Sequence, residues 1–411
     1  MTTLLPLDPT TEAVRAMYEQ FPYPAVADPD IRVGSHVRLL LSYGQLRRTA
    51  RRPLQCLDAG CGRANGALGA AITQPDVQFT AVDINRVALA DAKAKADQLG
   101  LSNIRFQEVD LMTLEGLRAP DGGFDVIVSS GVLHHLASPD EALRQLHRVL
   151  APHGVLSLMV YGTSGREPLY RMVRAIDLLV PRDRPVAERL AVARRLARLT
   201  AADALRVGPI ELTEALHDNE FVDRYLNVNE TSYDVASLWA LLERHDLRTL
   251  RWVEPDEWAL PTGTPDGEAF VAHLTDLQRY QLVEQISWRP RLSLIAGTTE
   301  NSPRRLPPGD QWPSLSFALN PDVSLEVETR NLRGTQRVEG IAYRLRVRPP
   351  VRLAGLAASV LLMLRDQTVP FLGKDLIQKL RADRIDRDTA LVVLADLVRR
   401  EIVYCPHSTE A

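Results

Sequence analysis

The sequence predicts an α/β protein whose main domain is a doubly wound, parallel sheet of seven strands with a helical insertion, followed by a smaller α+β domain. Two observations carry this prediction. From residue 54 onward, apolar runs of strand length alternate with helical segments, a pattern typical of parallel sheets covered on both faces. A polar, proline-rich stretch at residues 298–313 then separates that alternation from a second pattern of strands and helices. The length of 411 residues suits two or three domains.

Residues 1–50 are expected to form a helical lid. Residues 11–20 carry apolar side chains at helical spacing, and a Phe-Pro-Tyr-Pro stretch at 21–24 ends that helix, because proline lacks an amide donor and restricts the residue before it. A second helical stretch covers residues 36–48. The aromatic residues of this region either close over a bound acceptor or simply pack the helix on the sheet, and they are Tyr18, Phe21 and Tyr23.

Residues 51–300 are expected to form the seven-stranded domain. Five strands alternate with helices, and they cover residues 54–62, 77–85, 104–112, 124–136 and 154–162. Three helical segments then replace the alternation, which predicts a helical insertion at residues 165–230. Two more strands, at 248–255 and 291–297, complete the sheet.

The helix after the fourth strand has clear end signals. Ser138 is expected to cap it, with Pro139 in the first position. A Pro-His-Gly sequence at residues 152–154 is expected to stop it before the fifth strand begins.

Residues 314–411 predict a C-terminal α+β domain. Short strands precede three helices, and a short strand ends the domain, an order similar to a winged helix. The charges on the helices are mixed, whereas DNA binding favours an uncancelled basic face. We therefore expect this domain to mediate dimerisation or to bind a protein or peptide, and we regard nucleic acid as a weaker alternative.

Composition excludes several classes of protein. The net charge of −3 argues against a protein that mainly wraps DNA. No run of about 18 apolar residues is present, and the N-terminus lacks a signal-peptide pattern. The cysteines Cys56, Cys61 and Cys405 lack the spacing of a zinc or disulfide framework. These observations predict a cytoplasmic protein with no metal site and no membrane segment.

The strongest local signal is a glycine turn after the first strand, the sequence LDAGCG at residues 57–62. Gly60 and Gly62 let the backbone approach a ligand, and the following helix offers free amide groups. A dinucleotide would put its pyrophosphate here, where Asp58 would repel it, and the G-x-G-x-x-G spacing fails at Asn65. S-adenosylmethionine fits better, because its cationic groups suit the acid and its carboxylate suits the amides.

Two further acids follow the next two strands. Asp83 ends the second strand about 25 residues after Asp58, near the usual offset for an acid that binds ribose hydroxyls. Asp110 follows the third strand, where it can accept a hydrogen bond from an adenine amine. Ile84 and Leu111 can sandwich the adenine ring. The alternative is that each acid only caps a loop.

These motifs resemble the class I S-adenosylmethionine-dependent methyltransferases, in the branch of ubiquinone/menaquinone-type small-molecule methylases. The resemblance rests on the glycine turn, on AVD at 81–83, on VD at 109–110 and on SSGVLHHL at 129–136. It covers residues 50–165 well and extends more weakly to 300, and it implies a Rossmann-like fold. The implied cofactor contacts are Asp58, Gly60, Gly62, Asp83, Ile84, Asp110 and Leu111, with Ser130 or Gly131 near the methionine end. One departure is Ala64, where many members have a third glycine.

The fourth strand points to the chemistry. His134 and His135 follow it, where the acceptor is expected, and either can act as a general base because histidine titrates near neutrality. The alternative is that both only shape the floor of the pocket. The Ser-Ser-Gly-Val sequence also differs from the Asp/Asn-Pro-Pro-Tyr string used by methylases of planar nitrogens, which disfavours adenine, cytosine and glutamine acceptors.

The acceptor wall is expected to include part of the insertion. Residues 219–234 are unusually polar and aromatic for a connector, and Tyr225 and Tyr233 are its candidate acceptor contacts. The arginine-rich helices before it are expected to present a solvated face.

We therefore expect a methyltransferase that acts on a small molecule in a biosynthetic pathway. One alternative is a protein or peptide methyltransferase that uses the C-terminal domain to bind its acceptor. Another is a non-catalytic regulator that senses S-adenosylmethionine.

Overall fold

The computed structural model describes residues 7–24, 34–48, 52–199, 206–207, 210–211, 216–260, 265–332, 335–346, 348–367 and 369–407. The chain forms two compact units. Unit 1 comprises Met1–Val37 and Arg48–Ser302, and unit 2 comprises Arg38–Arg47 and Pro303–Ala411.

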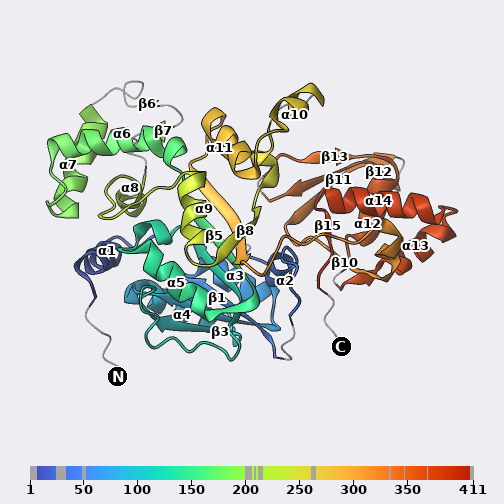
Figure 1. Ribbon diagram of the computed structural model, residues 1–411, viewed down its shortest axis with the longest axis horizontal. Coiled ribbons are helices and arrows are strands. Elements are labelled where there is room, and N and C mark those ends of the chain that lie inside the picture. Colours follow the sequence, from blue (N-terminus) through green and yellow to red (C-terminus); the bar gives the residue numbers. More distant parts are fainter. Residues whose placement is uncertain are drawn as a thin grey trace. The chain divides into compact units, whose positions relative to one another are not determined.

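Unit 1 is built on the predicted seven-stranded sheet (Figure 1), with strand order β3-β2-β1-β4-β5-β9-β8. The strands are β1 (Leu54–Ala59), β2 (Val77–Asp83), β3 (Ile104–Glu108), β4 (Phe124–Ser130), β5 (Leu150–Tyr161), β8 (Leu247–Trp252) and β9 (Arg291–Thr298). Strands β1 to β5 pair in parallel. Their carboxyl ends therefore lie along one edge, where open α/β sheets bind ligands.

Two details of the sheet differ from the prediction. Strand β9 pairs antiparallel with both β5 and β8, so the sheet is mixed. An apolar strand pattern carries no information about direction, so the sequence did not reveal this reversal. The Pro-His-Gly sequence at 152–154 also lies within β5, because the preceding helix already ends at Val149. The register between β4 and β5 shifts at this point, and the shift accommodates the proline.

Helices and short turns connect the strands of the sheet. They are α3 (Asn65–Thr73), α4 (Arg86–Gln98), α5 (Pro139–Val149), α9 (Val235–Glu243), α10 (Pro265–Val271) and α11 (Asp276–Ile286), with the short turns η1 (Leu133–His135) and η3 (Pro255–Trp258). As predicted, Ser138 caps α5 by accepting a hydrogen bond from the Glu141 amide, and Pro139 occupies its first turn. The core between sheet and helices includes Leu57, Ile127 and Leu143, which are fully buried.

The insertion forms a helical lobe of unit 1, drawn in green in Figure 1. It contains α6 (Thr163–Leu179), α7 (Val186–Leu199), the two-residue strands β6 (Arg206–Val207) and β7 (Ile210–Glu211), and α8 (Asp218–Tyr225). The N-terminal helix α1 (Pro9–Gln20) packs on this lobe, because Met17 lies in one cluster with Leu169 and Phe221. The predicted lid and the predicted insertion therefore share a hydrophobic core.

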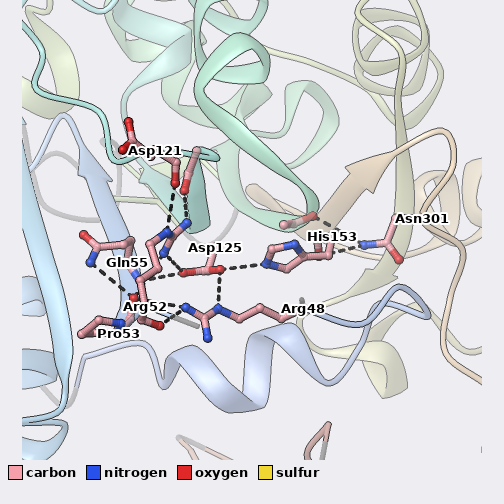
Figure 2. A network of polar contacts seen from close by, with 10 residues as sticks. Arg48, Arg52, Pro53, Gln55, Asp121, Asp125, His153 and Asn301 are labelled. Atoms are coloured by element: carbon pink, nitrogen blue, oxygen red, sulfur yellow. Dashed lines mark hydrogen bonds and ion pairs between the residues drawn. The ribbon is translucent and has the colours of Figure 1, made fainter. Parts of the chain in front are cut away.

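A polar network anchors the amino end of the sheet, opposite the edge where ligands are expected (Figure 2). Asp125, fully buried at the start of β4, accepts hydrogen bonds from Arg48 Nε at 2.9 Å and Arg52 Nη1 at 2.7 Å. It also binds His153 Nε2 at 2.7 Å, and Asn301 donates to the His153 carbonyl at 3.2 Å. Although burial opposes ionisation, these hydrogen bonds and charges lower the pKa of Asp125 to about 2. Arg48 and Asn301 lie at the two ends of the longer segment of unit 1, so the network holds both ends of that segment to the sheet.

Unit 2 has its own core of helices packed on short strands. A three-stranded sheet has the order β14-β10-β15, and the longer strands β11, β12 and β13 form a second sheet. The elements are η4 (Gly309–Ser314), β10 (Ser316–Leu319), β11 (Val323–Leu332), β12 (Thr335–Leu345), β13 (Val351–Leu353), α12 (Gly355–Leu364), β14 (Phe371–Leu372), α13 (Gly373–Ala382), α14 (Arg387–Arg399) and β15 (Val403–Tyr404). The α+β class is confirmed. The winged-helix detail is not, since β10 precedes all three helices and β11–β13 pair among themselves.

A segment from the N-terminal region belongs to unit 2. Helix α2 (Val37–Leu41) leads into this segment, residues 38–47. The Tyr43 carbonyl accepts a hydrogen bond from the Arg304 amide at 2.9 Å, and the Gly44 carbonyl bonds His407 Nε2 at 2.9 Å. The expected helical lid of residues 1–50 is thus divided between the two units.

Candidate functional site: the carboxyl edge of the sheet

The glycine turn brings the backbone close to its neighbours. Gly60 has a φ of +81°, and a Cβ at this position would lie 2.5 Å from the methyl groups of Val132. The amides of Gly60 and Cys61 both donate to the Val82 carbonyl at 2.9 Å, which holds the turn between β1 and α3 to the end of β2. Only glycine satisfies both constraints at residue 60.

Ala64 adopts a left-handed conformation at the position where many family members have a third glycine. It has a φ of 52° and immediately precedes α3. This left-handed conformation costs a non-glycine residue about 1 kcal/mol. The Ala64 amide donates to the Cys61 carbonyl at 2.8 Å, so the turn closes despite the substitution.

Asp83 is held at the end of β2 by two backbone amides. Its carboxylate accepts hydrogen bonds from Gly62 N at 2.7 Å and from Asn85 N at 2.8 Å. Burial raises the pKa of Asp83, although these two hydrogen bonds oppose the shift. The carboxylate is therefore fixed between the glycine turn and the start of α4.

Asp58 is the unusual group of the site. No hydrogen bond or ion pair reaches its carboxylate in the part of the chain that the structure describes. Burial, with a contribution from the neighbouring Asp83, raises the pKa of Asp58 to about 7. Two adjacent acids with no protein cation between them form a site that a positively charged ligand would stabilise.

Asp110 and the predicted adenine contacts lie beside these acids. Asp110 is buried and accepts a hydrogen bond from the Met112 amide at 2.9 Å, and burial raises its pKa. Ile84 is half-buried. Leu111 is only 3% exposed, so most of its surface already packs in the core of the sheet.

The end of β4 provides an open position. Ser130, the last residue of the strand, is exposed. Gly131 follows with a φ of +79°, and its amide donates to the Met159 carbonyl at 3.1 Å. Both residues therefore lie at the carboxyl edge, where the methionine end of the cofactor is expected.

Both histidines of η1 are buried, with His134 0% and His135 4% exposed, and they differ in their hydrogen bonds. His134 is fully buried, and its ring lies 3.8 Å from the ring of Tyr161. Neither of its nitrogens has a hydrogen-bond partner, and burial lowers its pKa well below the usual value. His135 instead bonds through Nδ1 to the Asn229 carbonyl at 2.9 Å. Because a carbonyl only accepts, Nδ1 carries the proton, and Nε2 has a free lone pair when the ring is neutral.

A buried ion pair lies behind these rings. Arg166 of α6 binds Glu230 at 3.0 Å, and its guanidinium carbon lies 3.5 Å from the centre of the Tyr161 ring. Tyr170 donates to the same glutamate at 2.8 Å. The pair fixes Tyr161 against His134, so the insertion helps to shape the floor of the site.

The N-terminal segment reaches the cofactor edge and the insertion together. The Tyr18 carbonyl accepts a hydrogen bond from Asn85 Nδ2 at 3.0 Å, while the Tyr18 hydroxyl donates to Asp223 of α8 at 2.7 Å. The Tyr23 carbonyl lies 3.3 Å from where a Cβ on Gly62 would stand. Phe21 is half-buried against the insertion. These contacts place Tyr18 and Tyr23 beside the predicted cofactor position.

Two predicted acceptor contacts are enclosed instead. Tyr225 is 1% exposed and packs on Phe221, with ring centres 5.1 Å apart. Tyr233 is buried in the core of the sheet, and its amide donates to the Tyr161 carbonyl at 2.9 Å. Both aromatic rings pack in cores, and their expected contact with the acceptor stays a prediction.

Sequence reasoning missed several polar groups around the histidines. Asn229 lies in the polar stretch 219–234, and its side-chain amide donates to the His135 and Leu136 carbonyls at 3.1 and 2.9 Å. The cluster of polar residues was the available signal for Asn229. No sequence pattern pairs Arg166 with Glu230, which is 64 residues away.

The described residues contain no cluster of three or more potential metal ligands, and none of their helices is long and apolar enough to cross a membrane.

The fold and the site define the class of protein. It is a Rossmann-like protein whose glycine turn and acids accept a nucleoside cofactor that carries positive charge.

Comparison with known proteins gives the family. The family described as "Methyltransferase domain" matches residues 51–173. An uncharacterized protein of Synechococcus sp. is 32% identical over 291 residues, 67% of this chain and 69% of the relative. The demethylmenaquinone methyltransferase of Thermus thermophilus is 33% identical over 131 residues, 30% of this chain and 58% of the relative.

The structure of PKMT2 from Rickettsia typhi shares the fold, with a TM-score of 0.63 at 15% identity over 92% of this chain and 75% of that one. A second structure of PKMT2 contains AdoHcy. The chain belongs to the class I S-adenosylmethionine-dependent methyltransferases, and S-adenosylmethionine is its cofactor. When bound, this cofactor supplies an electrophilic methyl group on a sulfonium.

Proposed function

We propose that the protein methylates a small molecule at an oxygen, nitrogen or carbon nucleophile, and that His135 takes the proton from this nucleophile. The observation that carries the proposal is the hydrogen bond from His135 Nδ1 to the Asn229 carbonyl. It sets the tautomer in which Nε2 is a base, and it fixes the ring. No protein group competes for Nε2 among the residues described.

The acceptor loses a proton to His135 Nε2, and its lone pair attacks the methyl carbon in line with the leaving sulfur. The bond between that carbon and sulfur breaks, and S-adenosylhomocysteine leaves as a neutral thioether. His135 releases its proton to water afterwards.

His134 does not suit this role. Its ring is fully buried, and burial beside His135 and Arg166 keeps it neutral, because the charged form would lose its hydration. We assign it to packing against Tyr161.

The surroundings of His135 favour a small acceptor. Three distant segments frame it: Tyr18 from α1, Tyr161 from β5 and Asn229 after α8. The Tyr18 ring lies 6.2 Å from the His135 ring and is tied to Asp223. A small acceptor fits between such fixed groups better than a folded surface.

The test is methyl transfer from labelled S-adenosylmethionine into an extract of the source cells. We expect label in the small-molecule fraction with wild-type protein, and a loss of about 10²–10⁴-fold with His135→Ala, the usual contribution of a general base. His134→Phe, which keeps the stacked ring, should retain most activity. Equal activity of wild-type protein and His135→Ala on the identified acceptor would show that His135 is not the general base.

A protein or peptide acceptor is the second candidate. Unit 2 favours it, because this unit has a hydrophobic core of its own and can serve as a binding domain. Label that enters the protein fraction instead of the small-molecule fraction would select this candidate.

A further inference from the structure

A hollow of about 450 Å³ lies on the surface of unit 2, far along the chain from the methyltransferase motifs. Helix α13 provides one wall, with Lys374, Ile377, Gln378 and Arg381. These residues are spaced three and four apart, so they lie on one face of the helix. Pro313 of η4 and Arg387 at the start of α14 complete the lining.

Three cations surround this hollow without a carboxylate partner. Lys374 and Arg381 make no ion pair among the described residues, and Arg387 makes only a long hydrogen bond, 3.4 Å, to the Asp310 carbonyl. All three side chains are exposed. Arginines elsewhere on the same helices are paired, as Arg399 and Arg400 are with Asp396.

The nearby acids are occupied by helix amides. Asp375 accepts a hydrogen bond from the Leu372 amide at 3.2 Å, and Asp386 accepts one from the Thr389 amide at 2.9 Å. Each of these carboxylates thus caps a helix, and neither forms an ion pair with Lys374, Arg381 or Arg387 among the described residues.

The shape of this arrangement points to an extended ligand. Lys374 and Arg381 are two helical turns apart, about 10 Å along the axis. A single phosphate is too small to meet both. Ile377, 7% exposed, lies between Lys374 and Arg381 along the helix, Pro313 also lines the hollow, and Gln378 adds an amide that can bond a peptide backbone.

We propose that this hollow is a docking site for an acidic peptide segment of another protein. Carboxylates of the segment pair with Lys374, Arg381 and Arg387, while an apolar side chain between them contacts Ile377 and Pro313. Nucleic acid fits less well, because Ile377 and Pro313 line the hollow and a phosphate backbone has no apolar group to contact them. The proposal does not depend on which acceptor the enzyme methylates.

The test uses the full-length protein and a fluorescein-labelled peptide of repeated Glu-Glu-Leu triads, with binding followed by fluorescence anisotropy. We expect saturable binding that weakens with salt, and none with a Lys-Lys-Leu peptide. The double charge reversal of Lys374→Glu and Arg381→Glu should weaken binding about tenfold or more, because two exposed ion pairs become repulsions. Lys379→Glu is the matched control, since Lys379 is exposed on the same helix outside the hollow, and it should change binding less than about twofold.

Arg387→Glu provides a second variant on a different helix, in case the double variant unfolds. If Arg387→Glu binds the peptide more weakly at an unchanged melting temperature, the result supports the hollow as the docking site. Binding that tolerates Arg387→Glu as well as Lys379→Glu overturns the proposal, as does the absence of peptide binding. Duplex DNA that binds the hollow more tightly than the peptide, and loses affinity in the same variants, overturns the peptide as the ligand.

Discussion

The raised pKa of Asp58 predicts that cofactor binding depends on pH near neutrality. Without a ligand the pKa of the Asp58 carboxyl is raised to about 7, because this half-buried group is desolvated next to Asp83, and none of the described residues supplies a cation to it. An ammonium bound beside Asp58 favours the ionised form and lowers its pKa. Binding at pH 6 must therefore release a proton, whereas binding at pH 8 does not.

The size of the effect follows from the pKa of about 7. If the pKa in the complex falls below about 5, affinity at pH 6 is about tenfold weaker than at pH 8. The raised pKa of Asp58 also changes how the stability of the ligand-free protein depends on pH. A carboxyl whose folded pKa is raised destabilises the ligand-free protein as the pH rises from about 4 to 7, and bound ligand removes this penalty.

Isothermal titration calorimetry with S-adenosylhomocysteine at pH 6, 7 and 8 measures both quantities. Repeating the titration in buffers of different ionisation enthalpy counts the released protons. Asp58→Asn is the matched variant, because it keeps the shape but cannot ionise. It should bind about 1.5–3 kcal/mol more weakly at pH 8, and its affinity should be flat across this range. Wild-type affinity that does not change with pH, or a pH dependence that persists in Asp58→Asn, would refute the reasoning.

Three further predictions test other parts of the structure. Gly60→Ala should abolish S-adenosylhomocysteine binding in a thermal-shift assay, because its φ of +81° and a neighbouring valine exclude a Cβ, whereas Gly66→Ala, which meets nothing within 4 Å, should bind normally. Asp125 should contribute about 2 kcal/mol of stability above pH 4, lost as the pH falls toward 2, so that urea melts of Asp125→Ala show a smaller loss of stability on acidification than wild type. A chain ending at Asn301 should still bind S-adenosylhomocysteine but melt at a lower temperature, because residues 38–47 pack with the unit it lacks. A truncated chain that is insoluble would show that the two units depend on one another for folding.

The sequence predicted the elements whose signals are local. Apolar runs at strand length revealed the seven strands, and Ser138-Pro139 marked the start of α5, because a cap and a first-turn proline act within one turn. The reversal of β9 and the membership of residues 38–47 in unit 2 were not visible. Both depend on which distant segment a strand or loop packs against, and no local pattern records that.

The same distinction holds for the site. The acids after consecutive strands could be predicted, since parallel strands end at one edge of a sheet. The difference between His134 and His135 could not, because it arises from the Asn229 carbonyl, 94 residues away from His135. The burial of Tyr225 and Tyr233 could not be predicted for a related reason: an aromatic residue in a polar stretch can fill a core as readily as it lines a pocket.

A crystal structure of the protein with S-adenosylhomocysteine tests the account of the site most directly. We predict the ribose hydroxyls on the Asp83 carboxylate, the adenine amine at Asp110 and the ammonium group beside Asp58, with the sulfur directed toward His135. A ligand that turns its adenine toward His135, or that leaves Asp58 without a cationic partner, would contradict the account.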